Sequence, residues 1–487
     1  MILDILEQAK TAGVRLYLKD GKLKAAVKNG QLPSQLKDVI GLHKQELITY
    51  LAQGNDPYHC EAGGSGGTPL SHSQKRIWFE QKLAIDQPHY NMQAHEHFSG
   101  ELDQHAFSRT IEAILERHQV LRSTYHEVNG EPEQLVQRQY RTPVTYSDLS
   151  ALDDGSKMVK MNDRVRQSGQ KVFDLERDLM LRVDVITLSQ QDHLVVYTMH
   201  HIASDAWSVE ILRKEVRQLY EGYRQGQEVE LPLLPIQYRD FAKWQNKRLT
   251  GEALANHLRY WSRVLDGAPR CHSLPLDQSR PSQPSHVGCV VNRSLGSDVV
   301  RDVERVCKQH QTTSFVLLQT VFALLVGRHG GQNDIVMGVP ISGRLRTELE
   351  PLIGFFVNTL PMRVSWQPDA TFSELLKQNK RQFSEAFDHQ EVPLDLLVKN
   401  ICPQRDTGQH PLFQIAFQVL KGGAAAEPKE AEVEQIKRAS ENKAPAQQKV
   451  SIKVDLELHV AHGAKGINCH WIYNEALFSE QRIQRIA

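Results

Sequence analysis

The sequence of 487 residues has few cysteines, no excess charge of either sign and no long apolar run. Its six cysteines are scattered without a Cys-x-x-Cys pair, which favours free thiols over a disulfide framework or a zinc site. The 58 basic and 58 acidic side chains cancel, which argues against binding to nucleic acid or a membrane surface. No segment approaches the roughly 20 apolar residues of a membrane span. The N-terminus also lacks the apolar core of a signal peptide, so we expect a cytoplasmic protein.

A glycine-rich break near the start divides the chain. Residues 54–68 are poor in apolar side chains and predict a flexible linker between residues 1–53 and the rest. Before the linker, a helical stripe near residues 2–9 precedes two alternating segments around the turn at Asp20-Gly21, and helical spacing returns over residues 36–51. This αββα unit has few groups to spare for catalysis, and we expect it to bind a partner.

The hairpin of this small unit carries basic side chains, which include Arg15, Lys19, Lys22 and Lys24. One interpretation is a solvated strand edge that resists aggregation. The other is an edge that accepts an acidic peptide as an additional strand.

From residue 69 onward, helical and strand patterns alternate, which predicts an α/β protein. The first half contains helical patterns at 103–120 and 207–223 and a strand at 193–199. The second half contains a helix at 312–329 and strands at 334–341, 355–366, 413–420 and 452–460, with a charged, alanine-rich excursion at 421–448. We therefore expect two similar lobes, residues 69–250 and 251–487, with any site where they face each other.

The segment MHHIASDAWS, residues 199–208, places two histidines at the end of an apolar strand. Side chains alternate along a strand, so only one of His200 and His201 should face a cavity. The pair could be buried beside a helix capped by Ser204 or Asp205, or it could belong to a metal site, although further ligands at recognisable spacing are missing. A neutral imidazole that acts as a base or hydrogen-bond partner is the third possibility.

The pattern His-His-x-x-x-Asp-x-x-Ser resembles that of condensation domains of nonribosomal peptide synthetases, which are related to chloramphenicol acetyltransferase. Seven other segments match motifs of this family in order: PLSHSQKRIWF, RHQVLRSTY, QYRDFAKWQ, GVPISGR, IGFFVNTLPMR, HQEVPLD and RDTGQHPLFQ. The first 53 residues, with GVRLYLKDGKLK, resemble a TubC-type docking domain. The resemblance implies two chloramphenicol-acetyltransferase-like lobes in a V-shaped pseudo-dimer, preceded by the small docking domain.

The resemblance also implies a reaction. The α-amine of an acceptor aminoacyl thioester attacks a donor acyl thioester, and both are carried on phosphopantetheine arms of carrier proteins. No enzyme nucleophile or bound cofactor or metal is needed, which agrees with the lack of a Gly-x-Ser-x-Gly elbow between a predicted strand and a predicted helix. By resemblance, His201 accepts the proton or positions the amine, His200 packs behind it, and Asp205 pairs with Arg344. The residues expected near the substrate tunnel are Ala206, Trp207, Ser208, Ser342 and Asn358.

Details of the motifs suggest a subtype. They look closest to domains that join an L-donor to an L-acceptor, and the order Trp207-Ser208 is the reverse of that in epimerisation domains. The family usually has glycine where this chain has Ala206. Expected partners are the C-terminal tail of an upstream subunit, donor and acceptor carriers, and a downstream adenylation domain. Two other hypotheses are a freestanding acyltransferase and a catalytically silent scaffold of the same fold, the latter supported only by Ala206.

Overall fold

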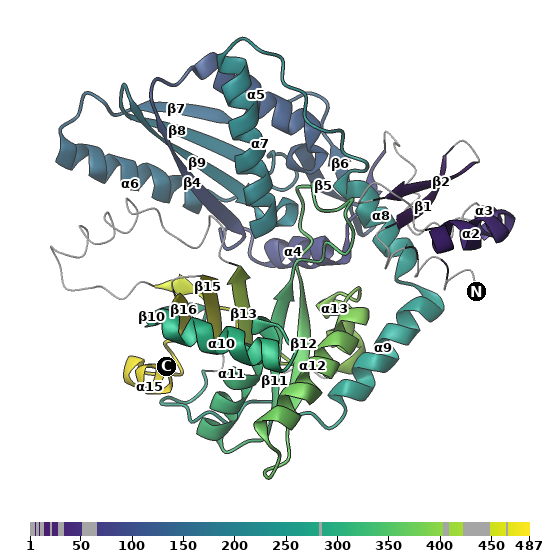
Figure 1. The fold of residues 1–487 in the computed structure, drawn as a ribbon. Coiled ribbons are helices and arrows are strands. Elements are labelled where there is room, and N and C mark those ends of the chain that lie inside the picture. The colour runs from purple at the N-terminus through teal and green to yellow at the C-terminus, as the bar shows by residue number, and fades with distance from the viewer. Residues whose placement is uncertain are drawn as a thin grey trace.

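The computed structural model describes Ile5, Ala9 and residues 14–19, 22–27, 34–50, 66–281, 285–402, 409–421, 449–463 and 466–487. Two α/β lobes lie one above the other in Figure 1, and each is built on its own sheet. The α/β fold class with two lobes is therefore confirmed. The predicted linker, apart from its last three residues, and the predicted excursion at 421–448, apart from Lys421, lie outside the described residues.

The N-terminal unit contains the expected hairpin. Strands β1 (Val14–Lys19) and β2 (Lys22–Val27) pair antiparallel, with Lys19 opposite Lys22. The helix expected over 36–51 is two helices, α2 (Ser34–Leu42) and α3 (Lys44–Tyr50), separated by a turn at His43. Of the helix expected at 2–9, the described residues are Ile5 and Ala9, which are both helical and buried.

The first lobe is organised around a four-stranded sheet in the order β4, β9, β8, β7. Its strands are β4 (Asn91–Ser99), β9 (Asp192–His200), β8 (Leu181–Ser189) and β7 (Val144–Asp148). Strands β7 and β8 are parallel, and the other pairs are antiparallel. A smaller sheet joins β3 (Thr68–Pro69), β6 (Glu131–Val136) and β5 (Ser123–Val128).

Helices cover both faces of the four-stranded sheet. On one face lie α5 (Gln104–Arg117) and α7 (Ala206–Arg224), and on the other lies α6 (Asp154–Gln170). Tyr197 and Met199 of β9 contribute to the core under α5 and α7, whereas Val196 packs on the side of α6. Strand β9 is thus buried on both faces, as its apolar run predicts. Helices α4 (His72–Leu83) and α8 (Tyr238–Arg248) complete the lobe.

The second lobe has a seven-stranded sheet in the order β12, β11, β13, β15, β16, β10, β14. In chain order, the strands are β10 (Val287–Leu295), β11 (Asp334–Ile341), β12 (Asn358–Ser365), β13 (Ile415–Lys421), β14 (Val450–Ser451), β15 (Leu456–Gly463) and β16 (Gly466–Asn474). Its helices are α9 (Gly251–Leu265), α10 (Ser297–Gln309), α11 (Ser314–Gly330), α12 (Phe372–Asp388), α13 (Leu394–Ile401) and α15 (Glu480–Ile486). One continuous hydrophobic core joins them.

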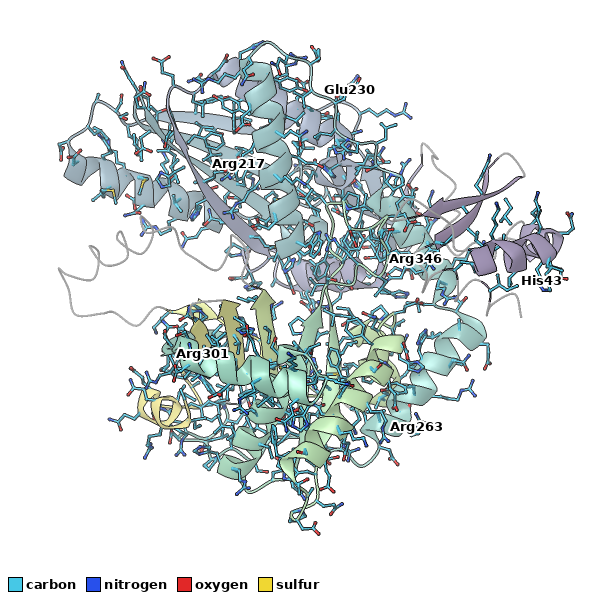
Figure 2. All side chains as sticks on the ribbon, viewed as in Figure 1. His43, Arg217, Glu230, Arg263, Arg301 and Arg346 are labelled. Atoms are coloured by element: carbon cyan, nitrogen blue, oxygen red, sulfur yellow. The ribbon has the colours of Figure 1, made fainter. Side chains whose placement is uncertain are left out.

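A crossing segment, residues 342–357, leaves β11 and packs in the first lobe. Its apolar side chains, Leu349, Leu352, Ile353, Phe355 and Phe356, are buried in the core of that lobe. Arg346, labelled in Figure 2, marks the position of this segment near the level at which the lobes meet. The strand expected at 355–366 therefore begins only at Asn358.

Within the described ranges, no single helix is long and apolar enough to cross a membrane. Helices α10 and α11 pass that test only as a pair, with a bend of 105° between them. The five cysteines in these ranges are free thiols.

Candidate active site

Strand β9 ends with the two adjacent histidines. The backbone N–H of His200 donates to the Met180 carbonyl at 3.2 Å, and that of His201 donates to the Tyr90 carbonyl at 2.8 Å. A short 3₁₀ turn follows, and α7 begins at Ala206. The chain thus changes direction at the point where the histidine side chains emerge, and the two imidazoles enter different environments.

The imidazole of His200 is part of the core. Its ring lies between those of Tyr90 and Phe173, with centroid distances of 5.9 and 5.6 Å, and the residue is 1% exposed. Its Nδ1 accepts the backbone N–H of Ile202 at 3.2 Å. Burial, and to a lesser extent the nearby His201 and Arg182, lower the pKa of His200 to about 3. His200 is therefore neutral and supports the turn.

The imidazole of His201 is held in one tautomer. Its Nδ1 lies 2.7 Å from the carbonyl oxygen of Ser204. A carbonyl can only accept a hydrogen bond, so Nδ1 carries the hydrogen. Burial lowers the pKa of His201. The ring of Phe355 packs against the imidazole, with 4.7 Å between the two ring centroids. The neutral ring keeps the lone pair on Nε2, which has no hydrogen-bond partner among the described residues and can accept a proton or a hydrogen bond.

The buried carboxylate of Asp205 fixes the turn after His201. Its Oδ1 caps α7 by accepting the Ser208 backbone N–H at 2.8 Å and the Ser208 hydroxyl at 2.7 Å. Its Oδ2 accepts from Arg344 Nη1 at 2.7 Å and from the Phe356 backbone N–H at 3.2 Å. Asp205 thus combines a helix cap with a buried ion pair.

Arg344 comes from the crossing segment and closes this ion pair. Its Nη2 donates to Asp205 at 3.1 Å and to the Leu352 carbonyl at 3.1 Å, and its guanidinium lies 4.3 Å from the ring centroid of Phe356. The arginine side chain is 1% exposed and the carboxylate 0%. The resemblance pairs these residues, and the structure places them together although 139 positions separate them in the chain.

The condensation domain family model matches residues 65–487. The chain belongs to this family. The model of the TubC N-terminal docking domain matches residues 2–53. One of the linear gramicidin synthase proteins of Brevibacillus parabrevis is 33% identical over 86% of this chain and 8% of its own length. Phosphinothricin tripeptide synthetase PhsC of Streptomyces viridochromogenes is 33% identical over 91% of this chain and 40% of its own length. The chain spans less than half the length of these relatives.

Solved structures share the fold. The first condensation domain of the calcium-dependent antibiotic synthetase, in complex with a substrate analogue, has a TM-score of 0.66 at 18% identity and covers 87% of this chain and 95% of its own. The X-domain from teicoplanin biosynthesis has a TM-score of 0.73 at 22% identity and covers 88% of this chain and 94% of its own. The chain is a condensation domain of the nonribosomal peptide synthetase type, preceded by a docking domain.

The residues expected along the substrate tunnel of the condensation domain lie in different environments. At the start of α7, Ala206 is exposed and Trp207 is half-exposed, with its Nε1–H bonded to the Glu350 carbonyl at 3.0 Å. Ser208 is buried, and its hydroxyl donates to Asp205 at 2.7 Å and accepts the Gly354 backbone N–H at 3.0 Å. Ala206 and Trp207 are accessible to a substrate, whereas the Ser208 hydroxyl is hydrogen-bonded within the protein.

Ser342 is the first residue of the crossing segment, and Asn358 is the residue that follows it. The Ser342 hydroxyl accepts the Arg344 backbone N–H at 3.4 Å. The Asn358 amide donates to the carbonyls of Gln390 and Val392 at 3.1 and 2.8 Å, and its oxygen accepts from Leu394 N–H at 3.1 Å. Asn358 also lines a pocket with Trp244, Phe356 and Glu391, so it both borders a cavity and holds one wall of it.

Two residues of the quoted motifs hold backbone segments around His201, although their individual roles were not predicted. Gln74, in PLSHSQKRIWF, donates from Nε2 to the Ile202 carbonyl at 3.0 Å. Tyr238, in QYRDFAKWQ, donates its hydroxyl hydrogen to the Phe355 carbonyl at 2.7 Å. The motifs identified the segments, but only the fold shows that Gln74 bonds the histidine turn and Tyr238 the crossing segment.

On the docking domain, the basic positions Arg15, Lys19, Lys22 and Lys24 lie on strands β1 and β2. Of these four side chains, only that of Lys24 belongs to the described part of the structure, and it is exposed. Elsewhere, no group of three or more His, Cys, Asp or Glu within the described ranges is placed to hold a metal ion.

Proposed function

We propose that this condensation domain forms an amide bond between a donor acyl or peptidyl thioester and the α-amine of an acceptor aminoacyl thioester. Both substrates are delivered on the phosphopantetheine arms of carrier proteins, and the proposed reaction needs no cofactor bound by the chain. The observation that carries the proposal is the Nε2 lone pair of His201, which the Ser204 carbonyl keeps available at the lobe interface. The motifs favour an L-donor and an L-acceptor.

The reaction requires little from the protein. The acceptor amine attacks the donor carbonyl, the new N–C bond forms and the C–S bond breaks, so the donor arm leaves as a thiol. His201 Nε2 orients the amine or takes the proton that the nitrogen loses. Asp205 and Arg344 do not touch the substrate in this mechanism. They hold the turn, so that the tethered reactants meet in a fixed geometry.

The test is reconstitution with separately loaded donor and acceptor carriers, followed by mass spectrometry of the acceptor carrier. We expect His201→Ala to lower product formation at least tenfold, equal to about 1.4 kcal/mol of barrier, while the fold persists. His105→Ala, on the exposed surface of α5, is the matched control and should retain the native rate. An unchanged rate in His201→Ala would exclude a chemical or positioning function for this residue.

A second candidate function is that of a catalytically silent scaffold, which binds a partner protein and forms no bond itself. In one solved structure, the X-domain from teicoplanin biosynthesis is in complex with OxyB, and this structure has a TM-score of 0.74 to this chain at 22% identity. Ala206, in place of the usual glycine, also favours this candidate. The same reconstitution decides between the candidates, because a silent domain gives no product from any donor and acceptor pair.

For the docking domain, we propose capture of the acidic C-terminal tail of an upstream subunit as a strand added to the hairpin. Capture raises the local concentration of the donor carrier without changing the chemistry. Deleting residues 1–53 should therefore slow condensation at low donor concentration and have no effect when the donor carrier is saturating or fused to the domain. High salt should weaken capture through screening of residues such as Lys24. Equal rates with and without residues 1–53 at every donor concentration would contradict the assignment.

We propose the domain limits 1–53 for docking, 54–68 for the linker, and 69–250 and 251–487 for the two lobes. The crossing segment is the part of the second half that packs in the first lobe.

In the complete synthetase, we expect an adenylation domain after this chain. The free thiols favour a reducing, cytoplasmic setting.

A further inference from the structure

A lysine from the second lobe reaches the neighbourhood of His201. Lys453 lies between β14 and β15, and its Nζ is 4.7 Å from the ring centroid of Tyr90 in the first lobe. Tyr90 is the residue whose carbonyl accepts the backbone N–H of His201 at 2.8 Å. The charge of Lys453 contributes to the lowered pKa of His201. The ammonium group thus approaches the proposed reaction centre from the opposite lobe.

The backbone that carries Lys453 is anchored on both sides. Before it, the Ile452 N–H donates to the His286 carbonyl at 3.0 Å. After it, buried Asp455 accepts from Arg280 at 2.9 Å and lies 3.0 Å from His272. The lysine is therefore presented from a fixed stretch of chain, which is the arrangement expected for a recognition group.

Lys453 makes no ion pair or hydrogen bond with any described residue. The carboxylates of Glu80 and Glu457 attract the ammonium through their charge. Each has another partner, because Glu80 lies 3.8 Å from Arg76 and Glu457 lies 2.9 Å from His459. The Lys453 side chain is exposed, and desolvation by the neighbouring protein atoms and the charge of Arg76 lower its pKa. An ammonium that has a π face but no ion-pair partner in the described part of the protein is stabilised when a ligand brings an anion.

We propose that Lys453 anchors a carboxylate-binding subsite beside His201, which selects a donor or acceptor acyl group that bears a free carboxylate. This inference rests on the proposed condensation function. The group that binds Lys453 is a carboxylate on a substrate side chain, and either the donor or the acceptor group can carry it. The ring of Tyr90 forms the floor of the subsite, since it holds the ammonium by its π face.

The experiment uses isosteric substrates that differ only in charge. Donor and acceptor carriers are loaded with glutamyl or glutaminyl groups in all four combinations, and condensation rates are compared for the intact chain and its variants. The intact chain should prefer glutamyl over glutaminyl on one of the two sides by about tenfold, the size of one charge-assisted hydrogen bond. Lys453→Met should abolish this preference and change the rate little for the pair in which both groups are glutaminyl. Lys453→Arg should retain the preference, and Lys453→Glu should reverse it.

Lys449→Met is the matched control. It removes a lysine four positions away that is exposed and pairs with Glu475 at 3.0 Å, and it should leave the ratio unchanged. Thermal unfolding of each variant checks that the fold persists. The subsite is refuted if the intact chain shows no charge preference on either side, if Lys453→Met keeps the preference, or if that variant slows all four pairs equally. The last result would place the lysine on a group common to every substrate.

A binding measurement separates this proposal from the proposed function. Glutamyl and glutaminyl pantetheine thioesters are titrated into the intact chain and into Lys453→Met by calorimetry, which requires no turnover. Tighter binding of the glutamyl compound that disappears in the variant supports the subsite even if no carrier pair condenses. In that case the proposed condensation activity fails and the subsite remains. Equal binding of both compounds by the intact chain overturns the subsite, whatever the condensation rates are.

Discussion

Two strand ends, one from each lobe, meet beside the candidate site and are used differently. Strand β9 ends at His200, turns through His201 and continues into α7 within its own lobe. Strand β11 ends at Ile341, and the following crossing segment packs in the other lobe. The first strand end displays an imidazole, whereas the second brings Arg344 to hold it in place. Two lobes of similar architecture therefore produce one site rather than two.

The end of β11 requires glycine where the end of β9 requires none. Gly343 has a φ of +64°, and a Cβ there would lie 1.9 Å from the Phe356 carbonyl oxygen. By contrast, the positive-φ residues other than glycine in the described part are Asn129 and Gln311, so Ala206 has an ordinary backbone conformation. The crossing segment is thus sterically constrained, and the start of α7 is an ordinary helix start.

The largest expected effect is the loss of the ion pair that joins the two strand ends. Asp205→Asn leaves the Arg344 guanidinium buried without a counter-charge, and we expect the free energy of unfolding to fall by about 3–5 kcal/mol. Urea denaturation measures this. Asp302→Asn, which breaks a pair with Arg305 on the surface of α10, should have no measurable effect. A loss in Asp205→Asn as small as in this control would mean that the two strand ends are not coupled through the pair.

The next effect tests the steric constraint at the end of β11. Gly343→Ala combines a left-handed backbone with the clash against Phe356, and we expect it to cost at least about 2 kcal/mol of unfolding free energy. Gly331→Ala is the matched control, because Gly331 also has a φ of +64° but no atom within 4 Å of the position that a Cβ would take. The difference in unfolding free energy between the two variants therefore measures the cost of the clash with Phe356. Equal losses would show that the crossing segment relaxes to accommodate the methyl group.

At the end of β9, the buried imidazole of His200 predicts acid sensitivity. Its pKa is 6.5 in the unfolded chain and about 3 in the folded one, so between these values only the unfolded chain binds the proton. This contribution to stability is complete above pH 6.5 and is lost as the pH falls toward 3. Between neutral pH and pH 5, His200→Asn should reduce the acid-induced loss of unfolding free energy by about 2 kcal/mol.

Urea denaturation at each pH measures this loss for the intact chain and the variant. Asparagine can still accept the Ile202 N–H, so the variant changes the titration more than the local hydrogen bond. His105→Asn, on the exposed surface of α5, should show the same pH dependence as the intact chain. An identical pH dependence in His200→Asn would mean that the folded state accommodates the charged imidazole.

The contrast between the strand ends also explains what could be predicted from the sequence. The apolar run of β9, the histidines and the apolar periodicity of α7 are local patterns, and they predicted the strand, the turn and the helix. The pairing of Asp205 with Arg344 spans 139 residues, and only the family resemblance suggested it. No local pattern indicates that Phe355 leaves its expected strand to pack against His201, or that Lys453 reaches Tyr90. Such contacts depend on how the lobes meet.

The smallest expected effect concerns Ala206, where the family usually has glycine. The residue is exposed at the first position of α7 with an ordinary φ, so its methyl group strains nothing in the protein. Ala206→Gly should lower the unfolding free energy by less than about 1 kcal/mol and change the condensation rate little. Denaturation and the carrier assay measure both, and Asp302→Asn again serves as the inert control. A large gain in rate would show that the methyl group obstructs the acceptor on its way to His201. The end of β9 would then restrict access as well as display the imidazole, and the silent-domain candidate would gain support.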